Sequence, residues 1–323
     1  MNPTTDAAAA RYPVRLVALR TGLSPHLLRA WERRYGVVAP SRSEGGQRLY
    51  SDLDIERLTR LRRLVEGGHA ISRIASLPLE ALAGLEESDA AGVQDPGGIV
   101  GRVEERGRAR SIEEFNDRAM RAVRALDAPE LEEVLERAAM TLGVPDFLEA
   151  VADTTLEDIG QGWSERSVSV AQEHVATAVF RRVLGWLLGL YQTISPAHRL
   201  VAATLPGERH ELGALMAAIT AAAEGWNVTY LGPDVPVEEL LGSVRQARAD
   251  ALALSVVRSG DERAVLSVLR QIRDGLPPRV ELLVGGAGAH GMEVGIESAG
   301  VHLIDSLADL RPALQRIAGE HSG

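Results

Sequence analysis

The chain has 323 residues, of which 45% are hydrophobic and 25% are charged, so it is long enough for two or three domains, each with its own core. It contains no cysteine, which excludes disulfides, thiolate zinc sites and cysteine nucleophiles and fits a reducing, cytoplasmic location. No apolar run has the length of a membrane span and the polar N-terminus does not resemble a signal peptide, so we expect no association with a membrane.

The net charge of −10 is unevenly distributed along the chain. Residues 1–80 hold 13 Arg against 8 Asp and Glu, a net charge of +5, and the rest of the chain therefore carries −15. Because only the N-terminal part is basic and the rest of the chain is acidic, we expect only the N-terminal part to bind a polyanion.

Residues 11–80 are predicted to form a small helical domain. One helical pattern begins near Val14, and a second begins at Ser24-Pro25 and runs to about Tyr35. Helices at this spacing are typical of a helix-turn-helix, whose second helix enters the major groove of DNA. A turn-rich loop from Pro40 to Tyr50 follows, before a third helix. The predicted DNA contacts are Arg29, Arg33 and Arg34 on the second helix and Arg42, Arg48 and Tyr50 in the loop. Charge alone leaves open that this is only a solvated basic face.

Residues 81–110 are rich in Gly, Asp, Glu and Arg and are predicted to be a linker. Residues 111–195 have helical periodicity and predict a four-helix bundle, with breaks near residues 127–129, 143–145 and 160–162. Trp163 follows the last break, and Glu173 and His174 lie on the next helix. Taken alone, such a Trp is more often part of a core, and such a Glu-His pair is more often surface than site.

Residues 196–320 alternate between apolar strands and helices. The expected strands are residues 200–205, 227–231, 251–256, 281–284 and 302–304, and the expected helices begin near Glu211, Pro236, Glu262 and Met292. This order predicts a doubly wound, five-stranded parallel sheet of the Rossmann-like kind. The fold class of the whole chain is therefore multidomain, α followed by α/β.

A candidate metal ligand follows the first of these strands, in Glu208-Arg209-His210. Open α/β sheets bind ligands at this edge, and a carboxylate beside a histidine can hold one imidazole nitrogen and leave the other for a metal. No second cluster of histidines has zinc-like spacing, which favours a metal that arrives inside a cofactor. The alternative is an ordinary surface histidine. Gly213, Ser255, Gly285 and Gly286 follow successive strands and leave room for a large flat ligand with a nucleotide-like tail.

Several motifs resemble known families. Leu28-Arg29-Ala30-Trp31-Glu32-Arg33-Arg34-Tyr35-Gly36, with Pro40, Arg42, Gly46, Arg48, Leu49 and Tyr50, resembles the winged helix-turn-helix of MerR-type regulators over about residues 12–78. Glu208-Arg209-His210-Glu211-Leu212-Gly213, Ser255-Val256-Val257 and Gly285-Gly286 resemble the Asp-x-His-x-x-Gly, Ser-x-Leu and Gly-Gly signatures of cobalamin-binding domains. Trp163 with Glu173-His174 resembles the Trp-x9-Glu-His pattern of photosensory cobalamin regulators. Together they resemble the CarH/LitR family of light-responsive, adenosylcobalamin-binding repressors.

This resemblance implies a transcriptional repressor, not an enzyme, that binds operator DNA in the dark as a homo-oligomer, from dimer to tetramer, and releases it in light. His210 would ligate the cobalt, with Glu208 orienting it directly or through water. The channel for the nucleotide tail would be lined by Gly213, Ser255, Gly285 and Gly286. The upper face of the cofactor, around its adenosyl group, would be covered by Trp163, Glu173 and His174.

One departure from the family keeps alternatives open. Some members carry a second histidine directly after the Trp, where this chain has Ser164. A light-independent cobalamin sensor or constitutive regulator is therefore the main alternative. A corrinoid methyltransferase or mutase subunit would not need the basic first part, and a multidrug-type MerR activator would not need His210.

Overall fold

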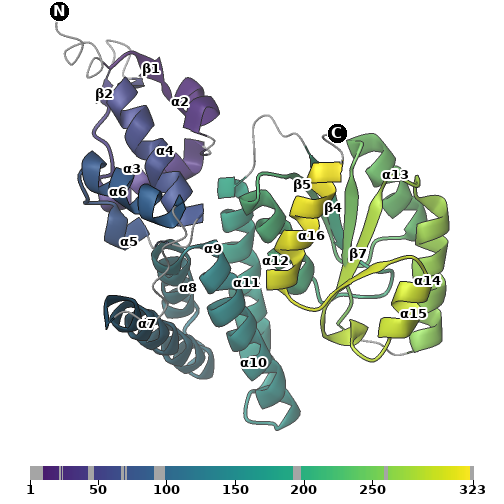
Figure 1. Cartoon of the computed structure of the whole chain (residues 1–323). Coiled ribbons are helices and arrows are strands. Elements are labelled where there is room, and N and C mark those ends of the chain that lie inside the picture. The colour runs from purple at the N-terminus through teal and green to yellow at the C-terminus, as the bar shows by residue number, and fades with distance from the viewer. Residues whose placement is uncertain are drawn as a thin grey trace, which may run out of the picture. The chain divides into compact units, whose positions relative to one another are not determined.

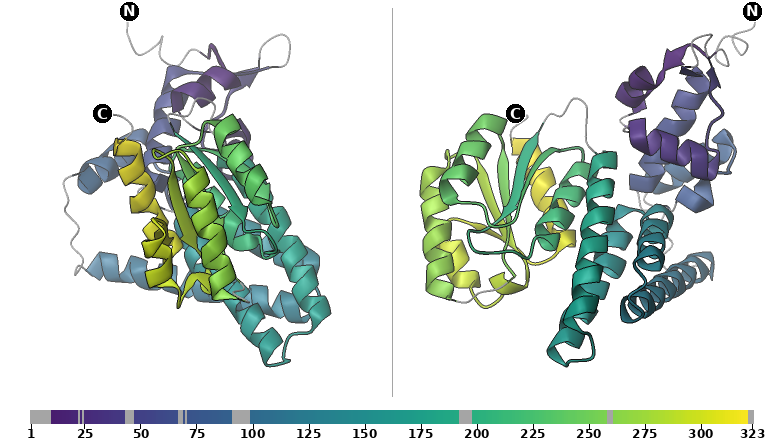
Figure 2. Two further views of the ribbon diagram at one scale, coloured as in Figure 1. Left: turned by 90° about the vertical axis from the view of Figure 1, so that its right-hand side faces the viewer. Right: turned by 180° about the vertical axis from the view of Figure 1, so that it is seen from behind.

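The computed structural model describes residues 10–320 except residues 22, 24, 43–46, 67, 68, 70, 91–98, 192–197 and 258–260 (Figures 1 and 2). The chain divides into two compact units, Met1–Val179 and Phe180–Gly323. Within the described ranges, no helix combines the length and the apolar character needed to cross a membrane.

The first part of the first unit is a winged helix-turn-helix. Its elements are β1 (Tyr12–Pro13), α2 (Val14–Thr21), α3 (Pro25–Tyr35), β2 (Ser41–Arg42), β3 (Arg48–Tyr50), α4 (Asp52–Glu66), α5 (Ile71–Ile74) and α6 (Leu79–Ala90). Helices α2 and α3 are the predicted pair, and the strands form an antiparallel sheet in the order β1-β3-β2, with β2 and β3 as the wing. Trp31 is 2% exposed, so the recognition helix α3 is fastened to the core by its indole.

Helices continue through the predicted linker. Helix α6 reaches Ala90, and α7 (Ile99–Arg124) begins nine residues later. The segment predicted to be a linker, residues 81–110, is therefore helical at both ends, where Glu and Arg are good helix formers, and its role as a linker stays a prediction. The centre, with Asp95-Pro96-Gly97-Gly98, lies outside the described residues.

The helical middle follows with α8 (Ala128–Leu142), α9 (Val144–Asp146), a π-helical segment η1 (Phe147–Asp153), α10 (Thr154–Ser164) and α11 (Val170–Tyr191). The first two predicted breaks are confirmed, and Asp127 caps α8 by accepting a bond from the Glu130 amide. The third is wrong, because α10 continues through residues 160–162 to Ser164. A Cβ on Gly162 would lie 2.6 Å from Val168 Cγ2. The glycine therefore does not end the helix, but leaves room for the turn between α10 and α11 to pack against it.

The second unit contains the predicted sheet. Its strands are β4 (Arg199–Thr204), β5 (Asn227–Gly232), β6 (Ala251–Ser255), β7 (Glu281–Gly285) and β8 (His302–Ile304), all parallel, in the order β5-β4-β6-β7-β8. Its helices are α12 (Leu212–Ala223), α13 (Val237–Ala247), α14 (Glu262–Gly275), the 3₁₀ turn η2 (Ala287–Ala289), α15 (Glu293–Ser298) and α16 (Leu307–Glu320). The doubly wound fold is thereby confirmed, and α16 is a helix that the sequence analysis did not include.

Helices cover both faces of this sheet, with α12 and α16 on one side and α13, α14 and α15 on the other (Figure 1). Alternate residues of each strand face each layer, so Val201, Ala203 and Leu205 join the core beneath α13 and α14. Strand β4 lies between β5 and β6, so the chain leaves β4 toward one neighbour and later returns to the other. The strand order therefore reverses at the β4/β6 edge, which is where doubly wound sheets open a crevice for ligands.

Candidate functional site

The loop after β4 presents His210 at this crevice, and hydrogen bonds to the loop's backbone hold it in place. The Glu208 carbonyl oxygen accepts from Thr204 Oγ1 at 2.6 Å and from the Asp234 amide at 2.9 Å. The Asp234 carboxylate in turn accepts from the Gly207 amide at 2.7 Å. The loop is thereby tied to the end of its own strand and to the turn after β5.

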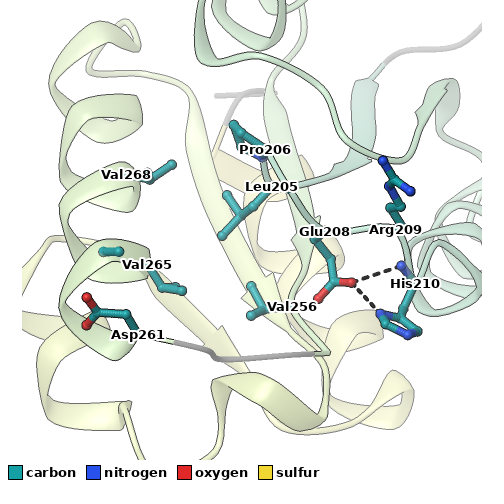
Figure 3. A pocket seen from close by; sticks show the side chains of 11 residues that line it. Leu205, Pro206, Glu208, Arg209, His210, Val256, Asp261, Val265 and Val268 are labelled. Carbon is teal, nitrogen blue, oxygen red and sulfur yellow. Dashed lines mark hydrogen bonds and ion pairs between the residues drawn. The ribbon is translucent and has the colours of Figure 1, made fainter.

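The Glu208 carboxylate fixes the histidine itself (Figure 3). Its Oε1 lies 2.5 Å from His210 Nδ1 and accepts from the His210 amide at 2.9 Å, and its Oε2 accepts from the Val257 amide at 3.0 Å. Glu208 is only 6% exposed, whereas 47% of the His210 side chain is exposed. A carboxylate at Nδ1 favours the tautomer with the proton on that nitrogen, so Nε2 carries the lone pair available to a metal. The contact that the sequence left as direct or water-mediated is direct.

A cleft adjoins the histidine at the carboxyl ends of β4 and β6. It has a volume of about 370 Å³, and its walls come from the His210 loop, Val256 and helix α14 (Figure 3). The α14 wall is formed by Asp261, Ala264, Val265 and Val268. Among the described residues, no group of three or more His, Asp or Glu could by itself hold a metal ion.

Ser255, Gly213 and Gly286, three of the residues predicted to line a nucleotide-tail channel, lie close together. A Cβ on Gly213 would lie 2.8 Å from Ser255 Oγ, and one on Gly286 would lie 3.1 Å from it. The Ser255 hydroxyl is buried and has no hydrogen-bond partner among the described residues. A buried hydroxyl without a partner is costly unless a ligand or water satisfies it, so the residues fit a polar group bound here.

Different contacts explain why Gly285 and Gly286 have no side chain. Gly286 has φ of +100°, and a Cβ there would lie 2.5 Å from the Val256 carbonyl oxygen. A Cβ on Gly285 would lie 2.7 Å from the Ile304 carbonyl oxygen of β8, so strand packing already accounts for this glycine. A role of Gly285 toward the cofactor stays a prediction.

The three residues predicted for the upper face lie in the first unit. Trp163 is in the last turn of α10, not at a helix start, and 46% of it is exposed. Glu173 and His174 lie in the first turns of α11, where His174 Nδ1 is 2.5 Å from Glu173 Oε2 and Thr177 Oγ1 donates to Glu173 Oε1 at 2.8 Å. The Ser164 hydroxyl donates to the Gly160 carbonyl oxygen at 3.1 Å.

The predicted DNA contacts divide into exposed and internally bonded residues. Arg29, Arg33 and Arg42 are exposed, and the Arg34 side chain lies outside the described ones. Arg48 Nε donates to both carboxylate oxygens of Glu32, at 2.9 and 3.0 Å. Tyr50 has no exposed surface, so its place among the DNA contacts is corrected to a support of the wing.

One cluster beside His210 was not recognised from the sequence. Glu211, which is 8% exposed, accepts at Oε2 from the Tyr230 hydroxyl at 2.7 Å and pairs at Oε1 with Arg181 Nε. Burial, and then the hydrogen bond to Glu211, raise the pKa of Tyr230, so its hydroxyl stays a donor at neutral pH. The sequence indicated only that Glu211 lies directly after His210. Its partners, Tyr230 and Arg181, are far from it in the sequence and could not be predicted.

Comparisons with known proteins agree with this architecture. A family model described as MerR HTH family regulatory protein matches residues 12–77, and two models described as B12 binding domain match residues 116–188 and 198–306. The HTH-type transcriptional repressor CarH of Myxococcus xanthus is 32% identical over 298 residues, which cover 92% of this chain and 96% of the relative. The repressor CarA of the same organism is 32% identical over 302 residues, with 92% and 94% covered. Among solved structures, the monomethylamine corrinoid protein of Methanosarcina barkeri has a TM-score of 0.52 at 17% identity and covers 63% of this chain and 99% of its own, which shows a shared fold.

Proposed function

The chain belongs to the CarH family of MerR-type, B12-binding transcriptional regulators, and on that premise we propose that it is an adenosylcobalamin-dependent, light-responsive repressor. The observation that carries the proposal is the Glu208–His210 pair, a half-exposed imidazole with one nitrogen held by a buried carboxylate. A single oriented imidazole at the ligand edge of a doubly wound sheet suits the cobalt of a corrinoid, to which it would supply one protein ligand.

The residues of the second unit are assigned to binding. His210 Nε2 would coordinate cobalt, and Glu208 would keep the ring oriented and its basicity high. Ser255 Oγ would hydrogen-bond to the nucleotide tail in the space that Gly213 and Gly286 leave open. When bound, adenosylcobalamin supplies a cobalt–carbon bond that visible light breaks.

The residues of the first unit are assigned to sensing and to DNA. Trp163, with nearly half of its surface exposed, and the Glu173–His174 pair would respond to the presence or absence of the adenosyl group. Arg29, Arg33 and Arg42 present exposed guanidinium groups to a phosphate backbone. Oligomers assembled in the dark would place several such heads on one operator, which multiplies modest affinities through effective concentration.

A gel-shift experiment with operator DNA tests the proposal. We expect adenosylcobalamin to promote DNA binding in the dark and green light to abolish it. The His210→Ala variant should show weak binding under both conditions, because its cofactor is not held from below. Binding that is the same before and after illumination would remove the light response.

A light-independent cobalamin regulator is the second candidate, and Ser164 favours it. A serine hydroxyl is a far weaker cobalt ligand than an imidazole, and here it is bonded to the Gly160 carbonyl oxygen. DNA affinity of the loaded protein before and after light separates the two. DNA binding that depends on cobalamin but is unchanged by illumination, even when the absorption spectrum shows that the cobalt–carbon bond has broken, would favour the second candidate.

A further inference from the structure

A buried carboxylate stands directly after His210 and does not act on the imidazole ring. Glu211 precedes the first turn of α12, and its side chain reaches away to β5 and α11, where it meets Tyr230 and Arg181. The Gly232 position, whose Cβ would lie 3.8 Å from Glu211 Oε2, leaves room for the carboxylate on the β5 side. One acidic group thus joins the loop of His210 to a strand and to a helix.

Burial makes these contacts obligatory for the local structure. A carboxylate with 10% of its side chain exposed needs partners, because an unpaired buried charge is strongly destabilising. The neutral Tyr230 hydroxyl donates a short hydrogen bond to the carboxylate, and Arg181 supplies a positive charge, although 55% of the Arg181 side chain is exposed and its pairing is screened by solvent. The negative charge also lies at the start of α12, where the helix dipole favours it.

The contacts of Glu211 have a different structural effect from those of Glu208. Glu208 fixes the direction of the ring through Nδ1, whereas Glu211 fixes where the backbone of residue 211, and hence the His210 Cα beside it, lies relative to β5 and α11. Helix α11 is continuous from Val170 to Tyr191, so the helix that Arg181 ties to this loop is the one that carries Glu173 and His174.

We propose that Glu211 is a positioning residue for the cobalt ligand, held by Tyr230 and Arg181, and that this network fastens the C-terminal half of α11 to the His210 loop. The inference rests on the proposed function for its consequence, the placement of His210 toward cobalt. Its structural part, the fastening of loop and helix, can be measured in the protein without cofactor.

The variants are Glu211→Gln, Tyr230→Phe, Arg181→Met and the conservative Arg181→Lys. Glu224→Gln is the matched control, because Glu224 caps the other end of α12, lies 3.6 Å from Arg311 Nε and accepts from Gln315 at 3.1 Å. Tyr230→Phe removes one hydrogen bond and leaves the carboxylate paired with Arg181, so it keeps the test possible where Glu211→Gln unfolds.

Two readouts are needed on the full chain. Hydrogen exchange of the cofactor-free protein should show the amides of the His210 loop and of residues 180–191 exchanging several-fold faster in Glu211→Gln and Tyr230→Phe than in the parent. Titration with adenosylcobalamin in the dark should show about 10-fold weaker binding for Glu211→Gln, as expected for replacing a charge-assisted hydrogen bond and ion pair by neutral contacts. Arg181→Lys should retain most of the affinity that Arg181→Met loses, and Glu224→Gln should match the parent in both readouts.

Failure of the inference and failure of the proposed function look different. Equal exchange and equal affinity in Glu211→Gln and Glu224→Gln would overturn the positioning role. His210→Ala should lose the spectrum of histidine-coordinated cobalamin while its α11 amides exchange as in the parent. If His210→Ala keeps that spectrum, the proposed cobalt ligand is wrong, and the exchange data on Glu211 still decide whether the network holds α11.

Discussion

At the scale of single residues, the glutamate before the histidine does more than its sequence position indicates. The motif showed only a carboxylate two residues before an imidazole, and the structure adds that one oxygen holds the ring while the other accepts from the Val257 amide after β6. The imidazole is therefore oriented by a group that is itself anchored to the neighbouring strand, as precise metal ligation requires.

Tyr50 leads to a prediction about pH. Burial, and then the neighbouring Glu32 carboxylate, raise its pKa from 10 to about 12, so the folded state binds this proton more tightly than the unfolded state does. The stabilisation from neutral Tyr50 is complete below pH 10 and is lost as pH rises from 10 through 12. Because the chain has no lysine, few other groups titrate there.

The measurement is the free energy of unfolding by denaturant across this pH range, in the parent and in Tyr50→Phe. We expect the parent to lose stability more steeply between pH 10 and 12 than the variant, which cannot ionise at this position. Parallel curves for the two proteins would show that Tyr50 titrates normally.

At the scale of elements, an ion pair joins the wing to the recognition helix. Arg48 of β3 donates to both oxygens of Glu32 in α3, a residue whose side chain is 18% exposed. This pairing raises the pKa of Arg48 and commits one edge of its guanidinium to the protein. We therefore expect Arg48 to position the wing, whereas the exposed Arg42 of β2 contacts phosphate directly.

The salt dependence of DNA binding separates these roles. Replacing a phosphate contact, as in Arg42→Gln, should reduce the slope of log affinity against log salt by about 1. Arg48→Gln and Glu32→Gln should each weaken binding with little change in slope, and the double variant should be no worse than either single one. A reduced slope in Arg48→Gln together with additive losses would assign Arg48 to the DNA instead.

The same scale shows which elements can be predicted from sequence. The strands of the sheet are apolar runs bounded by turn residues, and all of them lie within a residue or two of their predicted limits. The break predicted at Gly162 is wrong because a glycine can mark either the end of a helix or a place where another segment packs closely against it. Here Val168 packs against Gly162, and this contact cannot be recognised from the sequence. Helix α16 contains Pro312, and α7 contains Gly101 and Gly107, so single residues that disfavour a helix hid the helical tendency of their neighbours.

In the candidate site, contacts between residues close in the sequence could be predicted, and contacts between distant residues could not. Contacts between near neighbours, such as Glu208 with His210, are indicated by their spacing, which left open only whether this contact is direct or runs through water. The approach of Gly213 and Gly286 to Ser255 requires three strands to meet in register, and the sequence indicated it only through the order of the strands. The Arg181–Glu211–Tyr230 network joins residues 19 and 30 positions apart on three elements, and no local pattern announces it.

At the scale of the whole molecule, the division of the chain at Val179 and Phe180 predicts unfolding in two steps. A ligand stabilises whatever it binds in the folded state, in proportion to the logarithm of its concentration over its dissociation constant. Hydroxocobalamin, which lacks the adenosyl group, should therefore raise the unfolding temperature of the step that belongs to residues 180–323, where His210 and Ser255 lie. Adenosylcobalamin in the dark should raise both steps, because Trp163, Glu173 and His174 of the first unit are proposed to respond to its upper ligand.

Calorimetry of the full chain, with hydrogen exchange to assign each step, measures this. Trp163→Ala should confine the effect of adenosylcobalamin to the second step, and His210→Ala should reduce the effect of both cofactors. Trp163 is about half exposed, so its truncation should cost the cofactor-free first unit little. If both cofactors shift the same single step and Trp163→Ala changes nothing, the first unit does not sense the adenosyl group, and the light response would need another origin.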